Sequence, residues 1–147
     1  MTFAEMEHEV QRIVGSLRRH DVGVGDLVAL APRNDAASVA RLFAVPRTGA
    51  SVLIVNARLG PAELADQLAR TRAVVAFDGI GGVVDPGVVG EPDPSITLEP
   101  ERDHSILFTS GSTGRPKPVR LTWGNLCLLY TSPSPRDHLS YLVCRLL

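Results

Sequence analysis

The chain of 147 residues has few cysteines, few aromatic residues and almost no net charge. It contains two cysteines, and only 5% of its residues are aromatic. Both cysteines lie within residues 127–147, so the sequence before that segment offers neither a disulfide nor a thiolate metal site. Fifteen Lys and Arg residues face sixteen Asp and Glu residues, which leaves a formal charge of −1 and no basic patch. This balance argues against nucleic acid as a partner.

Long apolar runs are also missing. No uninterrupted apolar span approaches the roughly 20 residues that a membrane helix needs, and residues 1–5 do not have the pattern of a signal peptide. We therefore expect a cytoplasmic protein without a membrane span. His8, His20 and His104 show no metal-ligand spacing, and we expect them to be surface residues.

Hydrophobic residues make up 44% of the chain, and their periodicity alternates between helical and strand-like. The pattern predicts helices over residues 3–19, 36–47 and 61–72, the first opened by a Thr2–Glu5 capping box. Pro46 in the last turn of the second helix predicts a kink or an early stop. Strands are expected over residues 27–31, 51–55, 74–77, 105–108 and 119–122, with a loop over 78–102 that holds one short strand near 83–84. This order predicts an α/β fold, with a mostly parallel sheet and helices on both faces.

The most informative segment joins the last two predicted strands. Between the apolar Leu107 and Val119 it reads Phe-Thr-Ser-Gly-Ser-Thr-Gly-Arg-Pro-Lys-Pro, with four hydroxyls, two glycines and a lysine. Glycines let consecutive N–H groups converge on an anion, while the hydroxyls add donors and Lys117 adds a positive charge. The segment is equipped to hold a polyphosphate.

A P-loop of the Walker A type is not expected, because there the lysine enters a helix directly. Here Lys117 lies between Pro116 and Pro118, and Pro118 disfavours helical backbone at Lys117. A plain surface turn, in which the hydroxyls only satisfy backbone groups, is the remaining alternative.

The run from Thr109 to Lys117 resembles the signature loop of the adenylate-forming, or AMP-binding, superfamily of acyl- and aryl-CoA synthetases. Segments upstream are similar to that family in the same order, notably residues 24–30 and 49–59. The resemblance covers residues 2–126 and implies part of the large N-terminal domain of such an enzyme. Pro118 departs from the glycine that is commoner in the family after the lysine, which puts the loop's flexibility in doubt.

The resemblance implies a site and its ligands. The cofactor-binding residues it implies are Thr109, Ser110, Gly111, Ser112, Thr113, Gly114 and Lys117. The hydroxyls and Lys117 would bind the β- and γ-phosphates of ATP, while Arg115 would stay in solvent. ATP, Mg²⁺ and coenzyme A are the implied cofactors and co-substrates, and a small carboxylate is the implied substrate. No catalytic or metal-binding residue is expected here, since the family's magnesium glutamate and catalytic lysine lie beyond Leu126.

Within the superfamily, the short spacer before the loop and the segment 118–126 are most similar to o-succinylbenzoate–CoA ligases of menaquinone biosynthesis. A generic fatty-acyl or aryl-CoA synthetase and a peptide-synthetase adenylation domain remain alternatives. A non-catalytic nucleotide-binding module is a further alternative of another class. The chain by itself is expected to be inactive.

The sequence changes character at Cys127. Residues 127–137 resemble the conceptual translation of a transposase-library sequencing adapter, and residues 141–147 match a second part of the same reagent in the same frame. We expect residues 1–126 to be the natural fragment and residues 127–147 to be adapter read-through; a Pro-rich linker is the alternative.

Overall fold

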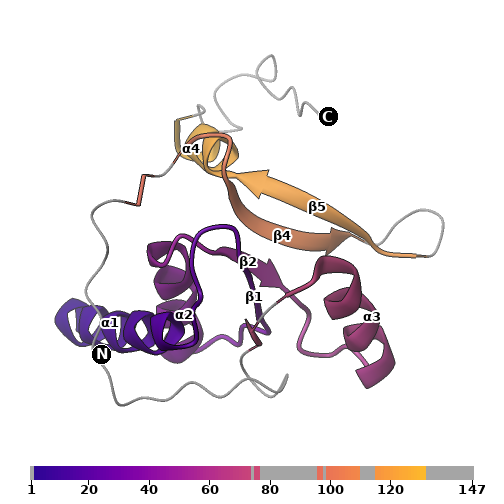
Figure 1. Ribbon diagram of the computed structural model, residues 1–147, viewed down its shortest axis with the longest axis horizontal. Helices are drawn as coiled ribbons and strands as arrows, with labels where there is room; N and C mark the ends of the chain where they lie inside the picture. The colour runs from indigo at the N-terminus through magenta and orange to yellow at the C-terminus, as the bar shows by residue number, and fades with distance from the viewer. Residues whose placement is uncertain (1, 74, 77–95, 98, 110–114, 132–147) are drawn as a thin grey trace.

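The structure is a computed structural model that describes residues 2–73, 75–76, 96–97, 99–109 and 115–131. Within these residues, four helices and five strands follow one another; their arrangement is drawn in Figure 1. In order they are α1 (Phe3–Arg19), β1 (Leu27–Leu30), α2 (Ala36–Arg47), β2 (Ser51–Ile54), α3 (Pro61–Thr71), β3 (Val75–Ala76), β4 (Asp103–Thr109), β5 (Lys117–Thr122) and α4 (Trp123–Thr131).

The five strands form one sheet in the order β3-β1-β2-β4-β5. The first four strands are parallel to their neighbours, and β5 pairs antiparallel with β4. The mostly parallel sheet predicted from the sequence is confirmed. Its antiparallel edge forms a hairpin that rises away from the remaining strands in the ribbon view (Figure 1).

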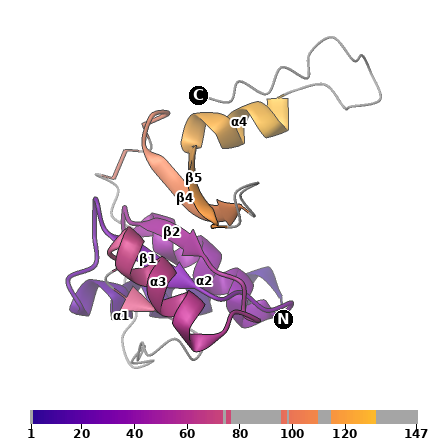
Figure 2. The same cartoon turned by 90° about the vertical axis from the view of Figure 1, so that its right-hand side faces the viewer.

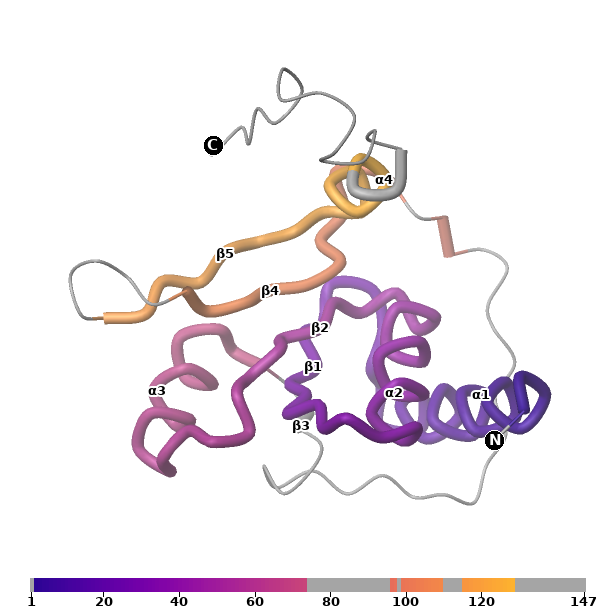
Figure 3. The backbone as a smooth tube through the Cα atoms, turned by 180° about the vertical axis from the view of Figure 1, so that it is seen from behind, coloured from indigo at the N-terminus to yellow at the C-terminus, as the bar shows by residue number. Residues whose placement is uncertain are grey.

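Helices cover both faces of the sheet, as predicted. Because successive side chains of a strand point to opposite faces, β1 contributes to two separate cores. Val28 and Leu30 pack with residues of α1 and α2, whereas Leu27 and Ala29 pack on the other face, where α3 contributes Leu64 and Leu68. Figure 3 shows α3 on one side of β1 and β2, with α1 and α2 on the other.

Capping side chains mark the N-terminal ends of the first two helices. Thr2 Oγ1 accepts from the Glu5 amide (3.2 Å), and the Glu5 carboxylate accepts from the Thr2 amide (2.7 Å), so the predicted capping box is present. Asp35 caps α2 through the Ser38 amide at 2.8 Å. This helix continues through Pro46 to Arg47, the end that its periodicity predicts, so the early stop expected at the proline is not observed.

Some predicted elements differ in length from those observed. Of the strand predicted over residues 74–77 the structure describes Val75–Ala76, which form β3, while β4 and β5 are longer than predicted. The helix α4 was not among the predicted elements. The short strand expected near residues 83–84 lies outside the described residues. Among the residues described, no helix is both long and apolar enough to cross a membrane.

Candidate nucleotide-phosphate site

The β4–β5 hairpin brings together the two ends of the signature loop. Thr109 and Lys117 are paired across the ladder, and Thr109 Oγ1 donates to the Lys117 carbonyl at 3.4 Å. These two predicted site residues therefore lie side by side at the tip of the hairpin. The other five predicted residues, Ser110, Gly111, Ser112, Thr113 and Gly114, lie outside the described residues.

The loop leaves the sheet at the edge where the parallel strands end. Strand β4 runs parallel to β2, with Val52 opposite Ser105 and Ile54 opposite Leu107, so the end of β4 lies on the same side as the end of β2. In open α/β sheets, ligands bind outside the carboxyl ends of the strands. The position of the hairpin tip is thus the one that the fold class favours for a ligand.

Helix α3 contacts the segment that closes the loop. Arg115 Nη2 lies 2.7 Å from Asp66 Oδ1, and Arg70 Nη1 donates to the carbonyl of Pro116 at 3.1 Å. The hydrogen bond from Arg115, with a second one from Arg70, lowers the pKa of Asp66 below its usual value. Arg70 also lies over the Phe108 ring, with 5.2 Å between its guanidinium carbon and the ring centroid.

Sequence reasoning did not find these contacts. Arg115 was expected to stay in solvent, and its side chain is indeed 71% exposed, but it forms an ion pair with Asp66. The two residues are 49 positions apart, and no local pattern links them. The only available signal was the i, i+4 spacing of Asp66 and Arg70, which is typical of a helical ion pair.

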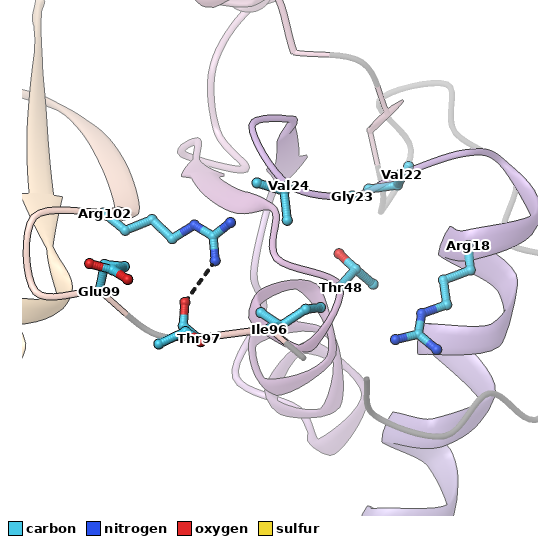
Figure 4. Close-up of a pocket in the computed structure, with 9 residues that line it drawn as sticks. All are labelled: Arg18, Val22, Gly23, Val24, Thr48, Ile96, Thr97, Glu99 and Arg102. Carbon is cyan, nitrogen blue, oxygen red and sulfur yellow. Dashed lines mark hydrogen bonds between the residues drawn. The ribbon is translucent and has the colours of Figure 1, made fainter. Parts of the chain in front are cut away.

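A cavity of about 560 Å³ lies elsewhere (Figure 4). Its lining includes Val24 before β1, Thr48 before β2 and Arg102 before β4. It therefore opens at the amino ends of the parallel strands, at the edge opposite the loop. Arg18 and Arg102 approach it from two sides, and Arg102 donates to the Thr97 carbonyl at 3.0 Å. Its position excludes it as the pocket served by the signature loop.

A smaller cavity, of about 310 Å³, adjoins the closing segment of the loop. It lies between α3 and Pro116, and its lining residues are Leu59, Ala62, Glu63, Asp66, Gln67 and Pro116. Figure 2 shows α3 in front of the sheet, below the end of the hairpin. The helix that contacts the loop thus also forms the wall of the neighbouring cavity.

Two further polar side chains near the hairpin, His104 and Asn125, lie outside the loop. His104 was expected on the surface, which is wrong: it is partly buried, and its ring meets Trp123 edge-on with centroids 4.6 Å apart. Burial lowers the pKa of His104. Within the described residues no group of three His, Cys, Asp or Glu could hold a metal ion. Asn125 Oδ1 accepts from the Thr122 amide at 2.9 Å at the start of α4.

Comparison with known proteins identifies the family. A profile of the family described as "AMP-binding enzyme" matches residues 1–143. The chain belongs to the AMP-binding enzyme family. This membership agrees with the resemblance in the signature loop and with the mostly parallel α/β fold.

Two relatives illustrate the similarity. A 2-succinylbenzoate–CoA ligase from Listeria innocua serovar 6a is 31% identical over 135 residues, which cover 84% of this chain and 29% of the relative. A feruloyl-CoA synthase from an Amycolatopsis species is 36% identical over 145 residues, which cover 86% of this chain and 29% of the relative. The chain therefore spans less than a third of the length of these relatives.

The fold is also similar to that of a solved structure. The o-succinylbenzoate CoA synthetase from Bacillus subtilis, in complex with AMP, matches with a TM-score of 0.73 and 24% identity. The match covers 93% of this chain and 42% of that protein. It shows that this α/β arrangement is the one found in the N-terminal domain of adenylate-forming enzymes.

Proposed function

We propose that the chain is the N-terminal part of an ATP-dependent, AMP-forming carboxylate–CoA ligase. Membership of the AMP-binding family supports this proposal. The structural observation that carries it is the β4–β5 hairpin, which places Thr109 and Lys117 side by side at the carboxyl edge of the sheet. Because the chain spans only a part of its relatives, the activity is proposed for the full-length protein.

In the first half-reaction a carboxylate oxygen of the substrate attacks the α-phosphorus of ATP. The bond between that phosphorus and the bridging oxygen of pyrophosphate breaks, which gives an acyl-adenylate and pyrophosphate. Negative charge grows on the departing pyrophosphate, and donors already in position stabilise such charge most effectively. We assign this role to Lys117 and to the hydroxyls of Thr109, Ser110, Ser112 and Thr113. Gly111 and Gly114 would give the backbone N–H groups close access to the phosphates.

In the second half-reaction the thiol of coenzyme A attacks the acyl carbonyl, and AMP leaves. Mg²⁺ bound to the polyphosphate would neutralise part of its charge. The described residues hold no cluster of metal ligands, so we assign no ligand of Mg²⁺ to them. In the family, the groups that complete both steps lie beyond Leu126.

For the carboxylate, we propose o-succinylbenzoate, which would place the enzyme in menaquinone biosynthesis. Relatives named 2-succinylbenzoate–CoA ligase from Listeria and Geobacillus, at 30–36% identity, support this choice. A second candidate is a hydroxycinnamate such as ferulate, because the feruloyl-CoA synthase is 36% identical over a similar length.

A substrate panel with the full-length enzyme tests the proposal. We expect ATP–pyrophosphate exchange that depends on a carboxylate and is fastest with o-succinylbenzoate, compared with ferulate, benzoate and a medium-chain fatty acid. Fastest exchange with ferulate would select the second candidate. ATP binding without exchange for any carboxylate would overturn the ligase proposal in favour of a non-catalytic nucleotide-binding module.

A further inference from the structure

We propose that Arg70 and Asp66 of α3 are positioning residues that hold the two ends of the phosphate-binding loop in place. The inference rests on the proposed function, because it assigns the two residues a role in binding ATP. Neither residue belongs to the signature loop, and both act on it from a neighbouring helix.

Arg70 contacts the loop on both sides. Its guanidinium lies over the ring of Phe108, which precedes Thr109, and its Nη1 donates to the carbonyl of Pro116, which precedes Lys117. One side chain therefore touches the strand that leads into the loop and the segment that leads out of it. Its own conformation is restrained by Asp66, whose Oδ2 lies 3.2 Å from Nη1.

Asp66 holds the closing segment through a second contact. Its Oδ1 accepts from Arg115 Nη2 at 2.7 Å, while Oδ2 accepts from Arg70. The carboxylate thus bridges two guanidinium groups, one on α3 and one on the loop segment. The ion pair with Asp66 thus connects Arg115 to α3.

One face of helix α3 packs against the core through partly buried side chains. Leu64 and Leu68 contact the cluster formed by β1 and β2, and Gln67 between them is only 6% exposed. By contrast, the first four residues of β5 are exposed, and β5 pairs on one side only among the described strands. The contacts therefore connect a helix that packs on the core to a strand whose first four residues are exposed.

The expected kinetic effect follows from this arrangement. Without Arg70 the ends of the loop are less restrained, and ATP binding must order them at an entropic cost. Exposed ion pairs, cation–π contacts and single hydrogen bonds are individually weak, so we expect Arg70→Ala to raise the KM for ATP about 5- to 20-fold. For Asp66→Asn, we expect about a 2- to 5-fold increase. The KM for the carboxylate and the thermal midpoint should change little.

The experiment measures ATP–pyrophosphate exchange of the full-length enzyme as a function of ATP and of carboxylate concentration. It compares the wild type with Arg70→Ala, Arg70→Lys and Asp66→Asn. Arg12→Ala serves as the matched control, because Arg12 forms a helical ion pair of similar exposure with Glu9, far along the chain from the loop. Arg70→Lys keeps the charge without the planar fork, and we expect it to fall between the wild type and Arg70→Ala.

A rise in the KM for ATP confined to the α3 variants supports the inference. If the α3 variants match Arg12→Ala, or lower kcat with both KM values unchanged, the positioning role is wrong and the proposed function stands. If the wild type shows no exchange with any carboxylate, the proposed function fails first, and the KM comparison loses its basis with it.

Discussion

Two regions of the molecule differ in how completely they are covered. The N-terminal unit comprises α1 to α3 and β1 to β3. In this unit all four residues of β1 are buried, with β2 and β3 on either side and helices on both faces. In the hairpin, the first four residues of β5 are exposed, and Val119 keeps 39% of its surface in solvent. The N-terminal unit thus contains the packing that stabilises the fold, while the hairpin carries the residues proposed to bind ATP.

The proposed site therefore depends on two parts of the molecule that are covered to different extents. The hairpin is joined to the sheet through β4 and to α3 through Asp66 and Arg70. A change in the cores should lower the stability of the whole fold, whereas a change at the hairpin tip should alter ligand binding and leave the fold intact.

The prediction with the largest expected effect concerns residues 127–147, which follow the β4–β5 hairpin in the sequence. Trp123 and Gly124 at the start of α4 donate backbone hydrogen bonds to Arg102 and Pro100, whereas Leu128 further along is 62% exposed. We predict that residues 127–147 are adapter read-through and that the natural protein continues differently after Leu126. Long-read sequencing of the source DNA across codon 127 should show a frame that continues into later motifs of the family. Genomic codons for residues 127–147 followed by a stop would contradict this prediction.

A core substitution should have the next largest effect. Leu53 on β2 is fully buried, and Leu53→Ala should lower the free energy of unfolding by about 2–5 kcal/mol, through lost burial and the cavity left behind. Val119→Ala on the exposed strand should lower it by about 1 kcal/mol or less. Chemical denaturation of the full-length protein measures both. If both substitutions lowered the free energy of unfolding equally, the contrast between the N-terminal unit and the hairpin would be wrong, because the rest of the protein would then cover β5.

A smaller, pH-dependent effect is expected where α1 meets α2. The Glu7 carboxylate accepts two hydrogen bonds from Arg47, which lower its pKa below the usual 4.5. Because the folded pKa is the lower one, the stabilisation is complete above about pH 4.5 and is lost as the pH falls through the folded pKa. Both side chains are partly exposed, so we expect Glu7→Gln to cost no more than about 1 kcal/mol at pH 7.

The control for Glu7→Gln is Glu9→Gln, which removes an ion pair made within α1 alone. Denaturation midpoints over pH 2–8 should show the Glu7→Gln deficit shrinking towards acid pH. A deficit that stays constant with pH would contradict the assignment to the Arg47 contact.

Much of the N-terminal unit could be predicted because its signals are local. The capping box at Thr2 and the apolar periodicity gave the bounds of α1, and Pro61 marked the start of α3. The signature loop was identified by residue order, and the pairing of Thr109 with Lys117 is consistent with its position between two strands.

The remaining features depend on contacts between distant residues. The strand order β3-β1-β2-β4-β5 and the antiparallel direction of β5 follow from tertiary packing, which periodicity does not reveal. The same holds for the Asp66–Arg115 ion pair and for His104, whose position in the sequence looked polar and whose ring packs on Trp123.

The central claim is that Lys117 at the hairpin tip stabilises the departing pyrophosphate. The most direct measurement is carboxylate-dependent ATP–pyrophosphate exchange by the full-length enzyme with Lys117→Ala. Arg120→Ala serves as the control, since Arg120 lies on the same strand and pairs with Asp103. We predict that Lys117→Ala slows exchange about 100-fold, with little change in the unfolding midpoint, while Arg120→Ala keeps the wild-type rate. Exchange at the wild-type rate in Lys117→Ala would contradict the claim.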